Sequence, residues 1–158
     1  MPIAFAFYDV VLTLHILAVV LAFGVVFAYP LIDAQIKRAG PSALPALHRM
    51  HVALATRLVT PAMVVVLLAG LYLVIDGPYG FDEPWVGATL VVLFILFGLT
   101  GALTPIDRRM AELAERDLRA GGELGADYRA EERKAAIMGS LALLLVVVAI
   151  FLMTAKPG

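Results

Sequence analysis

Four apolar segments, each long enough to cross a lipid bilayer, constrain the fold of this chain most strongly. They are residues 10–32, 52–75, 85–104 and 135–155. A transmembrane helix needs about 20 mostly apolar residues to cross roughly 30 Å of hydrocarbon. Only 16% of the residues are charged, whereas soluble domains contain about 25%. The sequence therefore predicts one all-α domain over residues 1–158, a polytopic membrane protein built as an antiparallel four-helix transmembrane bundle.

The beginning of the chain predicts a retained transmembrane helix rather than a cleaved signal peptide. The stretch MPIAFAFYDV has no Lys or Arg, and the apolar segment that follows is about 23 residues long, too long for a signal-peptide core. The chain has no cysteine, which excludes disulfides, thiolate metal sites, iron–sulfur clusters and haem attached through cysteine. A net charge of −1 gives no indication of nucleic-acid binding.

Basic residues predict the orientation of the bundle. They gather in two predicted loops, residues 33–51 and 105–134, whereas the loop DGPYGFDEP between the second and third segments has three acidic residues and no basic one. Loops rich in Lys and Arg stay in the cytoplasm. We therefore expect loops 33–51 and 105–134 to be cytoplasmic and both termini to lie outside, in a plasma membrane.

The loop after the third segment predicts a cytoplasmic amphipathic connector. Thr104, Pro105 and Asp107 offer an N-cap, a proline at the first helical position and an early acidic residue. Apolar residues then recur at helical spacing: Ile106, Met110, Leu113 and Leu118. Gly121-Gly122 ends the pattern. Two structures fit this pattern: an extension of the third helix, or a separate short helix on the inner membrane surface. In either structure the segment serves as a packed connector or as a docking site for a partner.

Arg57 is an unusual residue for an apolar segment, because a charged group at mid-helix costs roughly 2.5–3.5 kcal/mol. It lies about 10 Å to the cytoplasmic side of the middle of its segment. Pro61 cannot donate to the carbonyl of Arg57, four residues earlier, so that carbonyl needs another partner. Two interpretations stay open: Arg57 meets a buried acceptor such as Asp33, or it extends to lipid phosphates.

Other polar residues lie at a similar depth and predict a structural polar cluster. They are Tyr29, Asp33, His51, Thr60, Pro61, Thr100 and Thr104, with Asp107 just beyond. His48 and His51 share a helix face because they are three residues apart. In the outer half, His15 shares a face with small residues and is a candidate haem ligand, metal ligand, proton relay or packed hydrogen-bonding residue. His15 and His51 lie in opposite leaflets, so they cannot ligate one metal.

Several short motifs resemble known membrane proteins. Leu14-His15, Gly24 and Tyr29-Pro30, then RLVTPAM (residues 57–63) with Gly70, and the ending Ala155-Lys156-Pro157-Gly158 resemble the HemJ-type protoporphyrinogen oxidases. The wider group includes CopD-like copper-resistance domains and an uncharacterised bacterial family of predicted integral membrane proteins. The chain is most similar to this last family, through residues 81–85 (FDEPW) and 153–158 (MTAKPG). The resemblance implies a bacterial inner-membrane protein.

The HemJ-type resemblance implies that His15 is an axial ligand of haem b. The haem hypothesis adds Arg57, near a propionate or in a polar inner network, and Tyr29 as a further candidate cofactor-binding residue. That family's later helix-one histidine is replaced by Ile36, and its helix-three Lys and His are missing from GATLVVLFILFGLTG. Protoporphyrinogen oxidation is therefore not predicted. Three hypotheses stay open: a haem b redox protein, a non-enzymatic scaffold or accessory subunit in a homo-oligomer or larger membrane complex, and a small transporter or copper-handling module.

Overall fold

The four apolar segments fold into four helical rods in the computed structural model, which describes residues 7–157. The first rod is α1 (Phe7–Ala39). The second contains η1 (Pro41–Ala43), α2 (Leu44–Leu54), η2 (Ala55–Val59) and α3 (Thr60–Asp76), and the others are α4 (Pro84–Ala120) and α5 (Ala126–Ala155). Within residues 7–157 there is no strand, and each rod is long and apolar enough to span a membrane. The predicted all-α membrane bundle is thus confirmed. The first six residues, used above to argue against a signal peptide, and Gly158 lie outside the described residues.

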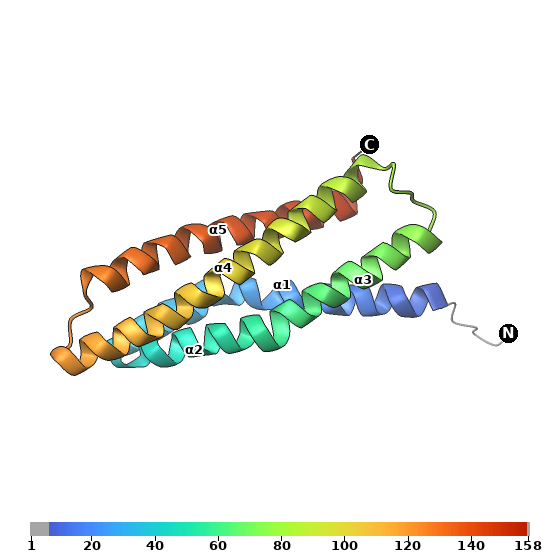
Figure 1. Ribbon diagram of the computed structural model, residues 1–158. Coiled ribbons are helices and arrows are strands. Elements are labelled where there is room, and N and C mark those ends of the chain that lie inside the picture. Colours follow the sequence, from blue (N-terminus) through green and yellow to red (C-terminus); the bar gives the residue numbers. More distant parts are fainter. Residues whose placement is uncertain (1–6, 158) are drawn as a thin grey trace.

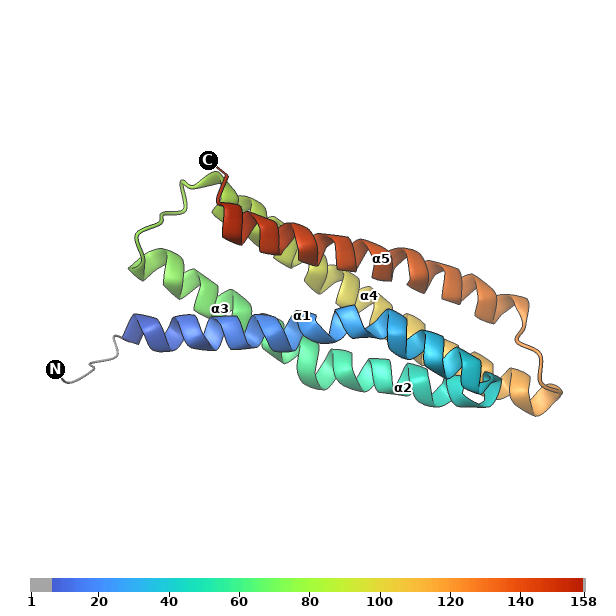
Figure 2. The same cartoon turned by 180° about the vertical axis from the view of Figure 1, so that it is seen from behind.

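The rods form two pairs that meet at one end of the bundle. α1 packs along α3, α4 packs along α5, and α2 packs along α4 (Figure 1). The two ends of the described chain and the loop between α3 and α4 lie together at the other end, as the view from behind also shows (Figure 2). Successive rods therefore run antiparallel.

The predicted loops are shorter than expected. α1 continues to Ala39, and α2 begins at Leu44, so most of residues 33–51 are helical. α4 continues through Pro105 to Ala120, which confirms an extended third helix and rules out a separate short one. Thr104 does not cap a new helix: its hydroxyl donates to the carbonyl of Thr100 at 2.8 Å. The helix persists because its apolar stripe beyond Pro105 is buried against α2 and α5, which outweighs one lost hydrogen bond.

Two glycines end α4 where the prediction placed a stop. Gly121 and Gly122 follow α4 with φ values of +133° and +103°, a region that side chains disfavour. The carboxylate of Asp117, buried near the end of α4, accepts the amide of Gly125 at 2.7 Å and so fixes the start of α5. This hydrogen bond, aided by Arg116, lowers the pKa of Asp117 despite the opposing effect of burial.

The RLVTPAM stretch forms a π-helical turn, η2, followed by α3. Pro61 has no N–H for the carbonyl of Arg57, so the α-helical pattern is interrupted there. The amide of Thr60 instead donates to the carbonyl of Ala55, the i→i+5 spacing of a π-helix. The extra residue in this turn changes which side chains face inward: Val59 is buried, and Arg57 is exposed.

Two apolar clusters stabilise the bundle. The larger one joins α1, η2, α3, α4 and α5 in the membrane-spanning part: Ala18, Ala22, Phe23, Val59, Ala62, Met63, Val66, Val92, Leu93, Leu96 and Val146. The second joins α2, α4 and α5 beyond the apolar segments: Leu44, Leu47, Met110, Leu113, Ala114 and Tyr128. This second core places polar groups of α1, α2, α4 and α5 close together.

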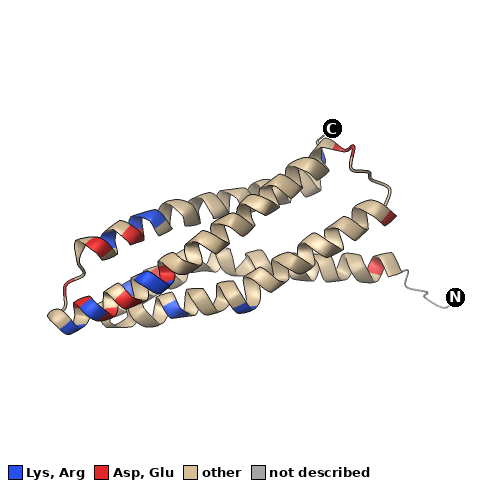
Figure 3. Cartoon of the chain, in the orientation of Figure 1, with Lys and Arg blue, Asp and Glu red and all other residues tan. Residues whose placement is uncertain are grey.

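Charged residues divide the molecule into two ends (Figure 3). Most Lys and Arg residues lie at the end formed by the C-terminal part of α1, α2, the C-terminal part of α4 and the N-terminal part of α5, here named the basic end. At the opposite end the charged residues are mainly acidic, namely Asp9, Asp76, Asp82 and Glu83. Lys156 is the exception. The polar cluster described next lies at the basic end.

Candidate metal centre

Two histidines of α2 face one carboxylate of α4. His48 Nδ1 lies 2.8 Å from Asp107 Oδ1, and His51 Nδ1 lies 3.5 Å from the same oxygen. One ligand atom from each of the three residues lies within 4.8 Å of the others. His48 is buried, and His51 and Asp107 are partly buried. The three side chains therefore converge on one point, as ligands of a metal ion do.

The other nitrogen of each imidazole has an oxygen beside it. His48 Nε2 lies 2.9 Å from the hydroxyl of Tyr128 on α5, and His51 Nε2 lies 3.1 Å from Asp33 Oδ1 on α1. The first pair is a hydrogen bond. The second pair is close but lacks the angle of a hydrogen bond. Both of its atoms, His51 Nε2 and Asp33 Oδ1, are buried with no hydrogen-bond partner among the described residues.

Helix geometry explains this convergence. The three-residue spacing puts both histidines on one face of α2, and the extension of α4 beyond its apolar segment carries Asp107 to the same level. The ring of Tyr29 on α1 packs on His51, with ring centroids 4.6 Å apart. Four elements, α1, α2, α4 and α5, thus fix the position and orientation of the imidazoles.

The cluster carries excess negative charge when its histidines are neutral, because Asp33 and Asp107 are carboxylates. Burial, followed by the nearby Glu132, raises the pKa of Tyr128 above its ordinary value. Its hydroxyl therefore stays protonated. Burial lowers the pKa of His51, but Asp107 and Asp33 outweigh this effect and raise that pKa to about 9. A proton on His51, or a metal cation between the imidazoles and the carboxylates, balances the negative charge.

A cavity of about 330 Å³ adjoins the cluster and extends toward the membrane-spanning part. The polar side chains around it include Tyr29, Asp33, His48, His51, Thr100, Thr104, Asp107 and Tyr128. Lys37 of α1 and Glu132 of α5 also line it and form an ion pair at 2.6 Å. The side chains of His48, His51 and Asp107 therefore face open space rather than closed packing.

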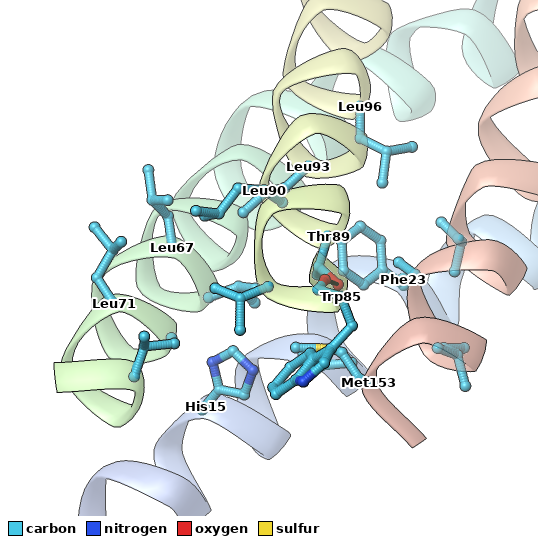
Figure 4. A pocket seen from close by; sticks show the side chains of 18 residues that line it. His15, Phe23, Leu67, Leu71, Trp85, Thr89, Leu90, Leu93, Leu96 and Met153 are labelled. Atoms are coloured by element: carbon cyan, nitrogen blue, oxygen red, sulfur yellow. Dashed lines mark hydrogen bonds between the residues drawn. The ribbon is translucent and has the colours of Figure 1, made fainter. Parts of the chain in front are cut away.

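His15 lies in a separate site, shown in Figure 4. The residue is 6% exposed, and Nδ1 has no hydrogen-bond partner among the described residues, although the carbonyl of Val66 faces the ring. The surrounding cavity has a volume of about 70 Å³ and is lined mostly by apolar side chains, with Trp85 and Met153 nearby. The ring rests on Gly70, where an added Cβ atom would lie 3.1 Å from Cε1.

The structure brings together only some of the residues predicted for the inner polar cluster. Those around the 330 Å³ cavity are Tyr29, Asp33, His51, Thr100 and Thr104. Thr60 and Pro61 are exposed at the start of α3. Arg57 is exposed and has no hydrogen bond or ion pair with another described residue. Asp33 therefore faces His51 rather than Arg57.

Sequence reasoning missed Tyr128, Lys37 and Glu132, and it did not recognise a ligand set. The signal that was present is the pair His48 and His51 at helical spacing, together with Asp107 directly after an apolar segment. Nothing in the sequence pattern placed Tyr128 opposite His48, because that contact depends on the packing of α5.

Comparison with known proteins agrees with this architecture at the level of the family. No curated protein and no solved structure shows significant similarity to the chain. One family model, described as a predicted integral membrane protein, matches residues 9–157. It covers all four helical rods and confirms the predicted resemblance to a family of that description. The chain therefore belongs to the predicted integral membrane protein family DUF2269.

Proposed function

We propose that this protein binds a divalent transition-metal ion at its basic end, with His48, His51 and Asp107 as ligands. The observation that carries the proposal is the convergence of both Nδ1 atoms on Asp107 Oδ1, at 2.8 and 3.5 Å. Each imidazole is oriented from its far side by a separate helix, through Tyr128 or Asp33. Such outer partners fix the tautomer that leaves the inner nitrogen free for a metal.

The ligand set suggests which metals bind and how. Two imidazoles and one carboxylate suit Zn²⁺, Fe²⁺ and Co²⁺, and imidazoles also bind Cu²⁺. Three protein ligands leave at least one coordination position open, as in metal sites that bind exchangeable ligands. Here the cavity of about 330 Å³ provides that open side. Copper handling, part of the third hypothesis left open from the sequence, is a special case of this proposal.

The test is a titration of the purified, chelator-treated protein with Co²⁺ and Zn²⁺, followed by calorimetry and by the visible absorption of Co²⁺. We expect one site per chain and loss of that site in His51→Ala and Asp107→Asn. His15→Ala is the matched control, because it removes a buried histidine outside the cluster. Equal binding by all variants would contradict the proposal. Absence of binding by the wild type would also contradict the proposal. In that case a proton on His51 balances the charge of the carboxylates, and the accessory-subunit hypothesis is favoured.

We also propose that the basic end is cytoplasmic and that both termini lie outside, in a bacterial plasma membrane. The support is the concentration of Lys and Arg at that end, since positively charged segments stay in the cytoplasm. The metal centre then lies near the inner membrane surface, where it has access to cytoplasmic metal ions.

Haem b at His15 is a second candidate, favoured by the buried, unpartnered Nδ1. In this arrangement the residues do not fit the whole cofactor: the cavity is about 70 Å³, whereas sites for drug-sized ligands measure about 300–1,000 Å³. Among residues 7–157, the side chains around it include no cation for the propionates, and Arg57 belongs to neither cavity. Absorption spectra after haem-supplemented expression test this candidate. A Soret band that disappears in His15→Ala would support haem binding, and its absence in the wild type would contradict it.

A further inference from the structure

The 330 Å³ cavity has one polar end and a larger apolar part. The polar end is the metal cluster, with Asp33, His51 and Asp107 in its wall. The apolar part is lined by side chains of α1, α2, η2, α4 and α5, among them Val26, Leu103 and Leu143. A cavity of this kind matches a molecule with one polar head and an apolar chain.

Side chains of α1 and of α5 line the cavity together with others from α2, η2 and α4. The α5 wall consists largely of small residues, Ala135, Ala136, Gly139 and Ser140, and no heavy atom beyond the local backbone lies within 4 Å of a Cβ added at Gly139. Among the described residues, the one ion pair between the two helices is Lys37–Glu132. The space is therefore not filled by side chains, and an apolar molecule could enter it from the hydrocarbon of the bilayer.

The charges around the cavity favour a neutral head group. A bound dication is balanced by the carboxylates of Asp33 and Asp107, and Lys37 is balanced by Glu132. An additional charged group would be buried without a counter-ion, which costs free energy. A hydroxyl or carbonyl oxygen can occupy the open coordination position without adding charge.

We infer that this cavity binds a neutral, single-chain amphiphile whose hydroxyl or carbonyl oxygen completes the coordination of the metal ion. The inference rests on the proposed metal centre. The chain of the ligand lies between α1 and α5, and its head lies beside His51 and Asp107. The site thus connects molecules dissolved in the bilayer to a metal ion at the membrane surface.

The test uses the full-length protein in lipid nanodiscs, first titrated with Co²⁺ and then with dodecan-1-ol. We expect dodecan-1-ol to shift the visible Co²⁺ spectrum, and dodecane, which has no oxygen, to leave it unchanged. Dodecanoate, which carries a charge, should act only at higher concentration. A diazirine-bearing long-chain alcohol then locates the chain, and we expect its cross-links on the cavity faces of α1 and α5.

Gly139→Leu fills the cavity and leaves the metal ligands in place, whereas Gly98→Leu adds the same side chain at an exposed position of α4 outside the cavity. We expect Gly139→Leu to bind Co²⁺ but to lose both the spectral shift and the cross-links, and Gly98→Leu to keep them.

Normal Co²⁺ binding without any effect of dodecan-1-ol, or with equal cross-linking in both variants, would overturn this inference and leave the metal centre intact. A wild-type protein that binds no Co²⁺ in the first titration would overturn both proposals. The order of the two titrations therefore separates the two failures.

Discussion

Asp33 of α1 presents Oδ1 to Nε2 of His51 on α2 at 3.1 Å, and both atoms are buried. On its other side, His51 faces Asp107 at 3.5 Å. An imidazole held between two carboxylates, with the Tyr29 ring packed against it, is a feature of metal sites in which one carboxylate coordinates and the other orients the ring. This relationship distinguishes the basic end from an ordinary helical connector.

The partners behind the imidazoles should tune metal affinity. Tyr128→Phe removes the oxygen beside His48 Nε2, and Asp33→Asn weakens the acceptor beside His51 Nε2. We expect each to weaken Co²⁺ binding about 10- to 100-fold, the usual effect of losing such a partner. Isothermal titration calorimetry measures the change. Asp76→Asn, a carboxamide substitution at the opposite end, is the control and should bind like the wild type.

Gly70 should be required for the position of the His15 ring. Gly70→Val places a branched side chain where a Cβ atom alone would lie 3.1 Å from Cε1. Overpacking of this kind destabilises by about 1–3 kcal/mol. Gly98→Val, where an added Cβ meets nothing within 4 Å, is the control. Unfolding in mixed micelles measures the difference, and the double variant with His15→Ala should recover most of the loss if the ring is the obstacle.

Asp117 should make stability depend on pH. Its pKa is lowered in the folded protein by the amide of Gly125 and by Arg116, so its contribution is present above its unfolded pKa, near 3.8. That contribution is lost as the pH falls through the lower, folded value. We expect Asp117→Ala to be less stable than the wild type from pH 5 to 7 and the difference to shrink below about pH 4.

The control for the pH dependence of Asp117→Ala is Asp127→Ala. Asp127 is exposed, and its Oδ2 lies 3.6 Å from Nη2 of Arg116, the same arginine that pairs with Asp117. Exposed ion pairs contribute about 0–1 kcal/mol. Thermal unfolding over this pH range checks both variants. A constant difference between Asp117→Ala and the wild type down to pH 3 would contradict the proposed role of the carboxylate.

The orientation can be tested directly because the chain contains no cysteine. Asp82→Cys and Arg119→Cys each introduce one thiol at an exposed position, at opposite ends of the bundle. With a membrane-impermeant maleimide applied to intact cells, we expect labelling of Asp82→Cys alone. Labelling of Arg119→Cys alone would invert the orientation and place the metal centre outside.

Local sequence determined more of the fold than of the site. The lengths of the apolar segments predicted four helical rods, since backbone groups in hydrocarbon must be satisfied within helices. Gly121-Gly122 correctly marked the end of α4. Thr104 and Pro105 suggested a new helix start, yet α4 continues through them, because burial of Met110, Leu113 and Ala114 outweighs the local signal.

The candidate site shows where local reasoning stops. The sequence by itself placed Asp33 and His51 at a similar depth, with Asp107 just beyond, since the rise per residue of a helix is fixed. Only the tertiary structure decided which of them meet. The π-helical turn before Pro61 leaves Arg57 exposed, so Asp33 faces His51 instead, and the packing of α5 brings Tyr128 to His48. Depth follows from helix geometry, whereas contacts depend on helix rotation and crossing, which are set by side chains distant in sequence.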